Sequence, residues 1–201
     1  MNGRCFSMVL LVSAIGLAAS IGFAAPPQQM RPYAGIGLLL IPDIDSPQKQ
    51  NLQLQLYEEP GLSRVKMLDK SNLLRNEHIF DSYGYAAPLI VSARKGEWLR
   101  VFFDDAGREA WINPKDRGHF ESWGEYLKQH TSRMLPALQP KYYQLLQKPD
   151  GKKFATLTPK QLFKVLKLDG SWGMVLTDKG QMGWLRWRDS DGRLTVGVAV
   201  K

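Results

Sequence analysis

Cysteine is almost absent from this chain of 201 residues, since Cys5 is the only one. Cys5 lies ahead of the first apolar run, in a segment that we expect to be removed, so the mature chain is predicted to have neither a thiol nor a disulfide. This excludes a cysteine nucleophile and thiolate zinc ligands from the mature chain. Burial of apolar side chains must therefore stabilise the fold.

Histidine is also scarce, and its spacing does not suit a metal site. The three histidines are His78, His119 and His130. His119 and His130 are eleven residues apart, which on a helix separates them by about three turns, too far to share one ion. The adjacent Asp104 and Asp105 are typical of a turn. We therefore expect no metal, no cofactor and no catalytic residue, and predict that the protein is not an enzyme.

Basic residues are numerous but are not clustered. The formal net charge is +8, and no run of Lys or Arg exceeds two residues. Charge spread in this way creates a diffuse field that favours acidic surfaces, such as phospholipid headgroups or anionic wall polymers. This field allows peripheral contact with a membrane; the alternative is a solvated surface that only aids solubility. No nucleic-acid partner is expected, because an exported protein seldom meets nucleic acid.

Long apolar runs are missing after the N-terminal region. Residues 8–21 are mostly apolar, Arg4 precedes them, and Gly22 and Ala24 supply small side chains after them. This order is typical of a secretory signal peptide, so we predict cleavage after Ala24, with Ala25 as the alternative site. An uncleaved membrane anchor is the other interpretation, although the apolar core is short for a membrane span. The predicted location is periplasmic or secreted.

One sequence pattern occurs twice. Residues 96–101 (GEWLRV) and 170–175 (GSWGMV) place Gly, Trp and Val at the same spacing. Each copy is followed by a second motif, in residues 107–112 (GREAWI) and 180–185 (GQMGWL), where a small residue precedes Trp and an aliphatic residue. Two such segments joined by a polar turn with glycine predict a β-hairpin. The chain is therefore predicted to contain two related β-units.

Short strand-like segments surround both hairpins. Residues 36–41 form an apolar run, residues 52–56 alternate leucine with glutamine, and residues 194–200 alternate larger aliphatic residues with smaller ones. Alternation of this kind is typical of half-buried strands. Many short strands separated by turns favour small barrels or sandwiches.

The region between the two units has a different spacing of apolar residues. Phe120, Trp123, Leu127, His130 and Met134 recur at spacings of three and four. This spacing predicts an amphipathic helix from about residue 119 to residue 133, which ends before a proline. We expect this helix to pack on one of the β-units.

The doubled Gly-x-Trp-x-x-Val pattern, with its small-Trp-aliphatic partner, resembles bacterial SH3-like (SH3b) domains in tandem. The resemblance covers roughly residues 52–114 and 142–201, and it implies five- or six-stranded barrels that act in targeting or binding outside the cytoplasm, often at the cell wall. The predicted fold is mainly β, with two small SH3-like barrels joined by an amphipathic helix. The predicted domains are a signal peptide (1–24), a flexible lead-in (25–34), a first barrel with a long variable loop (35–116), a helical connector (117–139) and a second barrel (140–201).

The resemblance also indicates candidate site residues. Trp98 and Trp172 fall where eukaryotic relatives have a tryptophan that forms part of a groove for Pro-rich peptides. Neither copy has the tyrosine that this groove needs after its last-but-one strand, which argues against polyproline recognition. The two indoles either stack on a ligand or seal the edge of a barrel. Trp111 and Trp184, which each follow a small residue, are expected in the core.

The long loop of the first unit, residues 69–88, supplies three further candidates. His78, Tyr83 and Tyr85 would form a polar and aromatic cleft if this loop folds over Trp98, and binding residues often lie on such loops. The alternative is a loop that only pins its own aromatic side chains to the barrel.

The sequence thus predicts a non-catalytic, exported binding or adaptor protein of the bacterial envelope. Its expected partner is cell-wall peptide (peptidoglycan) or an envelope protein, recognised through the tandem SH3-like barrels. One alternative is a structural subunit of an envelope assembly, in which the apolar face of the helix contacts a partner. The other is an accessory protein of a cell-wall hydrolase.

Overall fold

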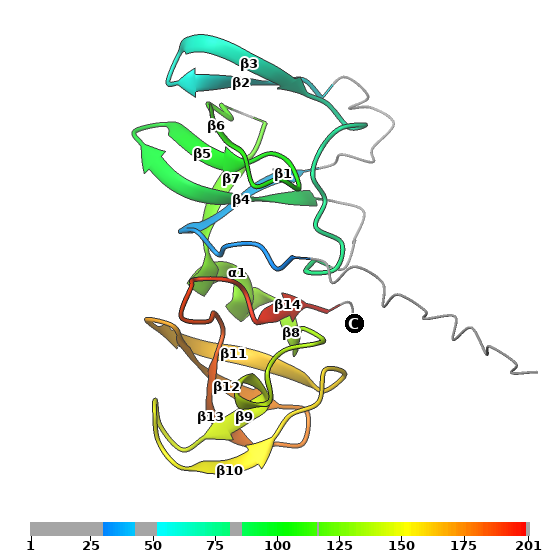
Figure 1. The fold of residues 1–201 in the computed structure, drawn as a ribbon, viewed down its shortest axis with the longest axis vertical. Coiled ribbons are helices and arrows are strands. Elements are labelled where there is room, and N and C mark those ends of the chain that lie inside the picture. The colour runs from blue at the N-terminus through cyan, green and yellow to red at the C-terminus, as the bar shows by residue number, and fades with distance from the viewer. Residues whose placement is uncertain (1–29, 43–51, 81–85, 116, 200–201) are drawn as a thin grey trace, which may run out of the picture. The chain divides into compact units, whose positions relative to one another are not determined.

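The computed structural model describes residues 30–42, 52–80, 86–115 and 117–199 (Figure 1). By its contacts the chain divides into two units, Met1–Met30 and Arg31–Lys201, and every element described below belongs to the second unit. The predicted signal peptide, residues 1–24, lies outside the described residues.

The first half of this unit forms a seven-stranded antiparallel sheet, which we call the first repeat. Its strand order is β3-β2-β6-β5-β4-β1-β7. The strands are β1 (Gly37–Pro42), β2 (Leu54–Glu59), β3 (Leu62–Leu68), β4 (Ala86–Lys95), β5 (Trp98–Phe102), β6 (Glu109–Ile112) and β7 (His119–Ser122).

The second half forms another seven-stranded antiparallel sheet, the second repeat, with the order β10-β9-β13-β12-β11-β8-β14. Adding seven to each strand number of the first order gives the second, so the repetition extends to every strand. The predicted mainly β fold with two related β-units is confirmed at this level. The elements are β8 (Thr131–Met134), the 3-10 helix η2 (Pro140–Tyr143), β9 (Gln144–Leu146), β10 (Lys153–Thr156), β11 (Leu162–Asp169), β12 (Trp172–Thr177), β13 (Met182–Arg186) and β14 (Val196–Val198).

The predicted hairpins are present, and they share a local irregularity. Gly96 and Gly170 adopt φ of +59° and +57° in the turns that precede Trp98 and Trp172, a conformation that glycine adopts without steric cost. The pairing of β4 with β5 shifts register just after Val91, and that of β11 with β12 shifts just after Val165. One extra residue at the same place in both hairpins is typical of a β-bulge.

The helix between the repeats is shorter than the spacing of apolar residues predicted. Helix α1 spans only Trp123–Gln129. It begins where Ser122 and Glu125 form a capping box, which satisfies backbone N–H groups at a helix start. The flanking residues form β7 and β8 instead, because they pair with β1 and β11. The residues assigned to a helical connector thus end the first repeat and begin the second.

The first repeat has its own apolar core, and β1 separates it from a second one. Leu39 and Ile41 belong to the core of the first repeat, together with Leu56, Leu89 and Val101. The alternate residues of β1, Leu38 and Leu40, belong to a different cluster that extends through the second repeat. A strand buried on both faces has a continuous apolar sequence, which explains the run predicted here.

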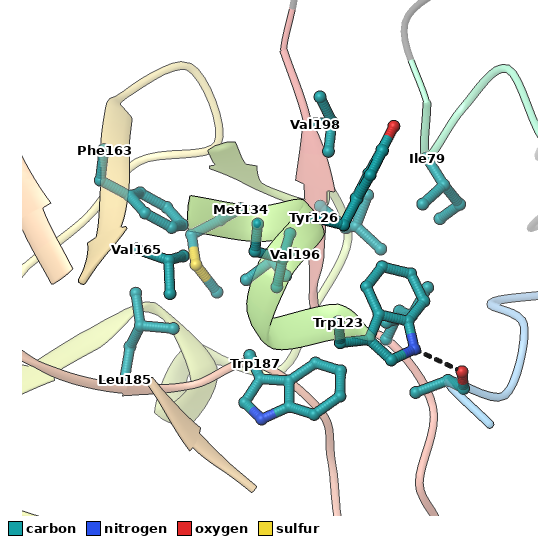
Figure 2. Packing of buried hydrophobic residues seen from close by; sticks show 14 of the residues in the cluster. Ile79, Trp123, Tyr126, Met134, Phe163, Val165, Leu185, Trp187, Val196 and Val198 are labelled. Carbon is teal, nitrogen blue, oxygen red and sulfur yellow. Dashed lines mark hydrogen bonds between the residues drawn. The ribbon is translucent and has the colours of Figure 1, made fainter. Parts of the chain in front are cut away.

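The second cluster joins both repeats and α1 into one core (Figure 2). Trp123 and Tyr126 of α1 are buried, and the Trp123 ring lies 5.7 Å from that of Trp187 and 6.2 Å from that of Phe80. Aromatic rings at such distances attract one another in addition to the gain from burial. The apolar face of α1 is therefore covered by the chain's own residues.

The core positions expected for Trp111 and Trp184 are wrong. Both indoles are only half-buried, whereas the small residues before them, Ala110 and Gly183, are buried. Successive residues of a strand point to opposite faces, so a small residue on the core side sends the tryptophan outward. A Cβ on Gly183 would lie 2.7 Å from Leu145 Cγ, which explains why a small residue stands there.

Residues 31–34, part of the lead-in that was expected to be flexible, are held by the second repeat. We call them the N-terminal clasp. Arg31 donates to the Leu194 carbonyl (2.8 Å) and pairs with Asp189 (2.6 Å). The Ala34 N–H donates to Gly192 O (2.8 Å), and the Ala34 carbonyl accepts from Trp123 Nε1 (2.6 Å). The chain thus contacts the second repeat before it enters the first.

Candidate functional site

A cleft of about 420 Å³ lies beside Trp172 in the second repeat. Trp172 opens β12 directly after the tight turn at Gly170, and it pairs across the hairpin with Arg186, the last residue of β13. The cleft is bordered by the 3-10 helix η2 and by the turn between β9 and β10. Its lining is formed by Lys141, Tyr142, Gln144, Leu146, Asp150, Gly151, Trp172, Arg186 and Ser190.

Arg186 covers part of the Trp172 indole. Its guanidinium carbon lies 4.3 Å from the ring centroid, a distance suited to a cation–π interaction. The same guanidinium pairs with the Asp150 carboxylate at 3.1 Å. The Asp150 side chain is 77% exposed, so this ion pair contributes little to stability. It orients the arginine over the indole more than it stabilises the fold.

The charges of the cleft are mixed, with a surplus of cations. Lys141 and Arg186 contribute positive charge, and the Lys141 Nζ lies 5.0 Å from the centre of the Tyr142 ring. Asp150 contributes the one carboxylate among the described residues of the lining. Gln144 and Ser190 add an amide and a hydroxyl. The cleft therefore presents an aromatic ring, side chains that donate and accept hydrogen bonds, and cations that can pair with an acidic group of a ligand.

Trp98 occupies the matching position in the first repeat but has other neighbours. Its indole is half-buried and meets the Tyr57 ring edge-on, at 5.4 Å and 89°. By register, Asn113 stands where Arg186 stands in the second repeat, since Leu99 pairs with Ile112 as Gly173 pairs with Leu185. The two candidate tryptophans are thus equivalent in the fold and different in chemistry.

The structure does not bring His78 to either tryptophan through any contact among the described residues. The backbone carbonyl of His78 accepts a hydrogen bond from Arg133 Nη2 (3.3 Å), and Ile79 O accepts one from Val198 N (2.8 Å). This part of the long loop therefore lies against the second repeat. Tyr83 and Tyr85 lie outside the described residues.

The environment of His78 disfavours its charged form. Burial lowers the pKa of the imidazole, and the nearby Arg133 lowers it further, while Asp105 opposes the shift. Both ring nitrogens are shielded from solvent, and neither has a hydrogen-bond partner among the described residues. His78 is therefore held neutral at the contact between the loop and the second repeat.

Reasoning from the sequence identified Trp172 but missed Arg186 and Asp150. Neither residue is among the candidates that the sequence indicated. Aligning the two Gly-x-Trp hairpins predicts that residue 186 lies opposite Trp172, which is the signal that could have found it. The pairing with Asp150 depends on how the β9–β10 hairpin folds back, and no local pattern gives that.

No protein-family model and no curated protein sequence matches the chain. Within the described ranges, no helix has the length and apolar character needed to cross a membrane. In the same ranges, no three side chains of His, Cys, Asp or Glu gather where they could hold a metal ion.

Proposed function

We propose that each repeat is an SH3-like module. Five strands of each sheet, β1 with β4–β7 and β8 with β11–β14, are adjacent in the strand order and form a five-stranded core. The remaining hairpin, β2–β3 or β9–β10, adds to the edge of that core. The number of core strands and the two hairpins with Gly-x-Trp both support this proposal.

We propose further that the protein is a non-catalytic binding protein of the bacterial envelope, in the periplasm or secreted, and that the Trp172 cleft is its recognition site. The observation that carries the proposal is the Trp172 indole with Arg186 held over it by Asp150, at the wall of a cleft of about 420 Å³. Clefts that combine one aromatic platform with a few polar groups are typical of ligand sites. The N-terminal sequence supports export.

The ligand that suits this cleft is a short peptide with an acidic group. Arg186 and Lys141 can pair with a carboxylate, and charge-assisted bonds of this kind are the stronger ones. The exposed part of the indole can support an aliphatic or amide portion of the peptide. Cell-wall peptide has this chemistry, and an acidic segment of an envelope protein is the second candidate. The net charge of +8 favours approach to anionic wall polymers.

The alternative, a structural subunit of an envelope assembly, has less support than the sequence alone gave it. It required the apolar face of the connecting helix to contact a partner, and Trp123, Tyr126 and Leu127 are instead buried within the chain. The other alternative, an accessory protein of a cell-wall hydrolase, is compatible with binding at Trp172, because such a protein also needs a surface that binds the cell wall.

Binding to purified peptidoglycan and to its isolated stem peptides tests the proposal. We expect Trp172→Ala and Arg186→Ala each to weaken binding about tenfold or more, which corresponds to a loss of roughly 1.4 kcal/mol. Met182→Ala is the matched control, because Met182 lies on β13 close to Arg186 in sequence but is 56% exposed and does not line the cleft.

One outcome would count against the proposal, and another would decide between its two candidate partners. One is equal binding by the wild-type protein and the Trp172→Ala variant, which would leave the indole as a sealing residue. The other is no binding to peptidoglycan together with recovery of one envelope protein, whose loss on Trp172→Ala would then select the protein partner.

A further inference from the structure

A second cavity lies in the first repeat. Its position does not correspond to that of the Trp172 cleft in the second repeat. Its volume is about 410 Å³, and its lining includes neither Trp98 nor Tyr57. Leu99, Pro114 and Phe120 provide its apolar surface, and Arg94, Lys115 and His119 lie around it. It is formed between the β4–β5 turn and residues 113–115 and 118–120.

The second repeat has a tryptophan at the equivalent place. Pro114 follows Ile112 by two residues, as Trp187 follows Leu185, and these two aliphatic residues occupy matching positions in the sheets. Leu99 corresponds in the same way to Gly173. A Cβ on Gly173 would lie 4.0 Å from Trp187 Cβ. The indole of Trp187 thus stands beside the position that lines the cavity in the first repeat.

Trp187 is fixed firmly in the second repeat. It is 4% exposed, its backbone N–H donates to Ser171 O (3.1 Å), and its Nε1 donates to Gly170 O (3.0 Å). Pro114 has no N–H, so the first repeat cannot form the equivalent backbone bond. Its ring is also much smaller than an indole. The first repeat therefore has an open cavity where the second repeat is filled by its own aromatic side chain.

The rim of the cavity carries positive charge. The Arg94 guanidinium lies 5.7 Å from the centre of the Phe120 ring. Among the described residues, no carboxylate lies within ion-pair distance of Arg94 or Lys115. Glu97 is the one acidic residue among the described residues of the lining. The second repeat has Leu168 where the first has Arg94 and Arg188 where the first has Lys115, so the Arg94 charge belongs to the open copy alone.

We propose that the cavity binds an aromatic side chain of an acidic peptide segment from a partner protein. Trp187 shows which side chain fills this place in the fold, and the basic rim selects carboxylates beside it. A second copy of this chain is a poor occupant, because two chains of net charge +8 repel each other. This site goes beyond the proposed function, and binding at the Trp172 cleft neither requires it nor follows from it.

Nuclear magnetic resonance titration of the ¹⁵N-labelled full-length protein with the peptide acetyl-Asp-Trp-Asp-amide tests the proposal. We expect saturable shifts of the amides of Leu99, Asn113 and Phe120. Acetyl-Asp-Ala-Asp-amide, which lacks the indole, and acetyl-Lys-Trp-Lys-amide, which reverses the charge, are each expected to bind at least tenfold more weakly. Equal binding of the reversed-charge peptide would overturn the proposal, as would shifts confined to Trp172, Gln144 and Ser190.

Two variants separate a filled cavity from a damaged fold. Pro114→Trp should fill the cavity with the side chain of the second repeat and abolish binding of the peptide. Arg94→Gln combined with Lys115→Gln changes two exposed side chains and should weaken binding tenfold with an unchanged melting temperature. If this double variant binds as the wild type does, the proposal is wrong even where Pro114→Trp fails to fold. Met182→Ala, on the second repeat, should bind the peptide normally.

Discussion

At the residue scale, Asp189 is the most constrained carboxylate that the structure describes. Its side chain is 5% exposed, pairs with Arg31 of the N-terminal clasp at 2.6 Å, and accepts hydrogen bonds from the backbone N–H groups of Asp191 and Arg193. Burial by itself would raise the pKa of Asp189, but the bonds from Arg193 and Arg31 outweigh it, so the pKa lies below its usual range. Asp189 therefore links the two ends of the described chain through one charge.

Replacement of this carboxylate should destabilise the protein in a way that depends on pH. A carboxyl group with a lowered folded pKa stabilises fully above its unfolded pKa of about 3.9 and loses that contribution as the pH falls through the folded value. Asp189→Asn should therefore cost about 1–3 kcal/mol at pH 7, and the difference from wild type should shrink below about pH 4. Urea unfolding at pH 7 and pH 3 measures both.

Asp150→Asn is the matched control for that prediction, because Asp150 is also paired with an arginine but is 77% exposed. Its cost should stay below about 1 kcal/mol at either pH. Equal costs for the two variants at pH 7 would show that burial of Asp189 contributes nothing.

His78 should add a second pH dependence, in a different range. Its folded pKa is lowered by burial, so the neutral ring stabilises the fold above the unfolded pKa of about 6.5. This contribution is lost as the pH falls through the folded value, because the unfolded chain takes up the proton more readily. His78→Phe should flatten the decline in stability below about pH 6.5, as followed by thermal unfolding. An unchanged slope in the variant would contradict this.

At the element scale, α1 is short but occupies the centre of the shared core. A helix of seven residues has little stability of its own, so tertiary packing must maintain it. Trp123 is 3% exposed and donates its indole N–H to the clasp at Ala34 O. The helix therefore depends on the two repeats, and the repeats depend on its aromatic side chains.

Truncation of the Trp123 side chain should be severe. We expect Trp123→Ala to cost about 3–5 kcal/mol, since it leaves a cavity among buried aromatic rings and an unpaired carbonyl at Ala34. Met182→Ala, which removes an exposed side chain, should change stability by less than about 0.5 kcal/mol. Chemical denaturation of both variants provides the measurement, and a loss below about 1 kcal/mol for Trp123→Ala would contradict the shared core.

What the sequence predicted at this scale was the part governed by local patterns. The two hairpins follow from glycine turns and alternating side chains, and β1 follows from a continuous apolar run. β7 and β8 could not be predicted, because each has four residues and both lie within a stretch spaced like a helix. Their strand character comes from pairing with β1 and β11, which are distant in the sequence. For the site, Trp172 was predicted from its motif, while its pairing with Arg186 and Asp150 depends on tertiary structure.

At the scale of the whole molecule, the shared core predicts that the repeats do not unfold separately. Leu38 and Leu40 of the first repeat lie in one cluster with Phe163 and Val196 of the second. Differential scanning calorimetry should therefore show a single transition whose calorimetric and van't Hoff enthalpies agree. Two transitions, or a Trp123→Ala variant in which only one repeat loses stability, would indicate that the repeats are independent.

The N-terminal clasp has a consequence for the order in which the molecule can assemble. Arg31 donates to the carbonyl of Leu194 at a separation of 163 residues, so the clasp, which is synthesised early, has its partners among the last residues of the chain. Until those late residues arrive, the side of β1 that carries Leu38 and Leu40 lacks the part of its cluster that the second repeat supplies. During synthesis or export, the clasp therefore cannot form its contacts with the second repeat until almost the whole chain is present.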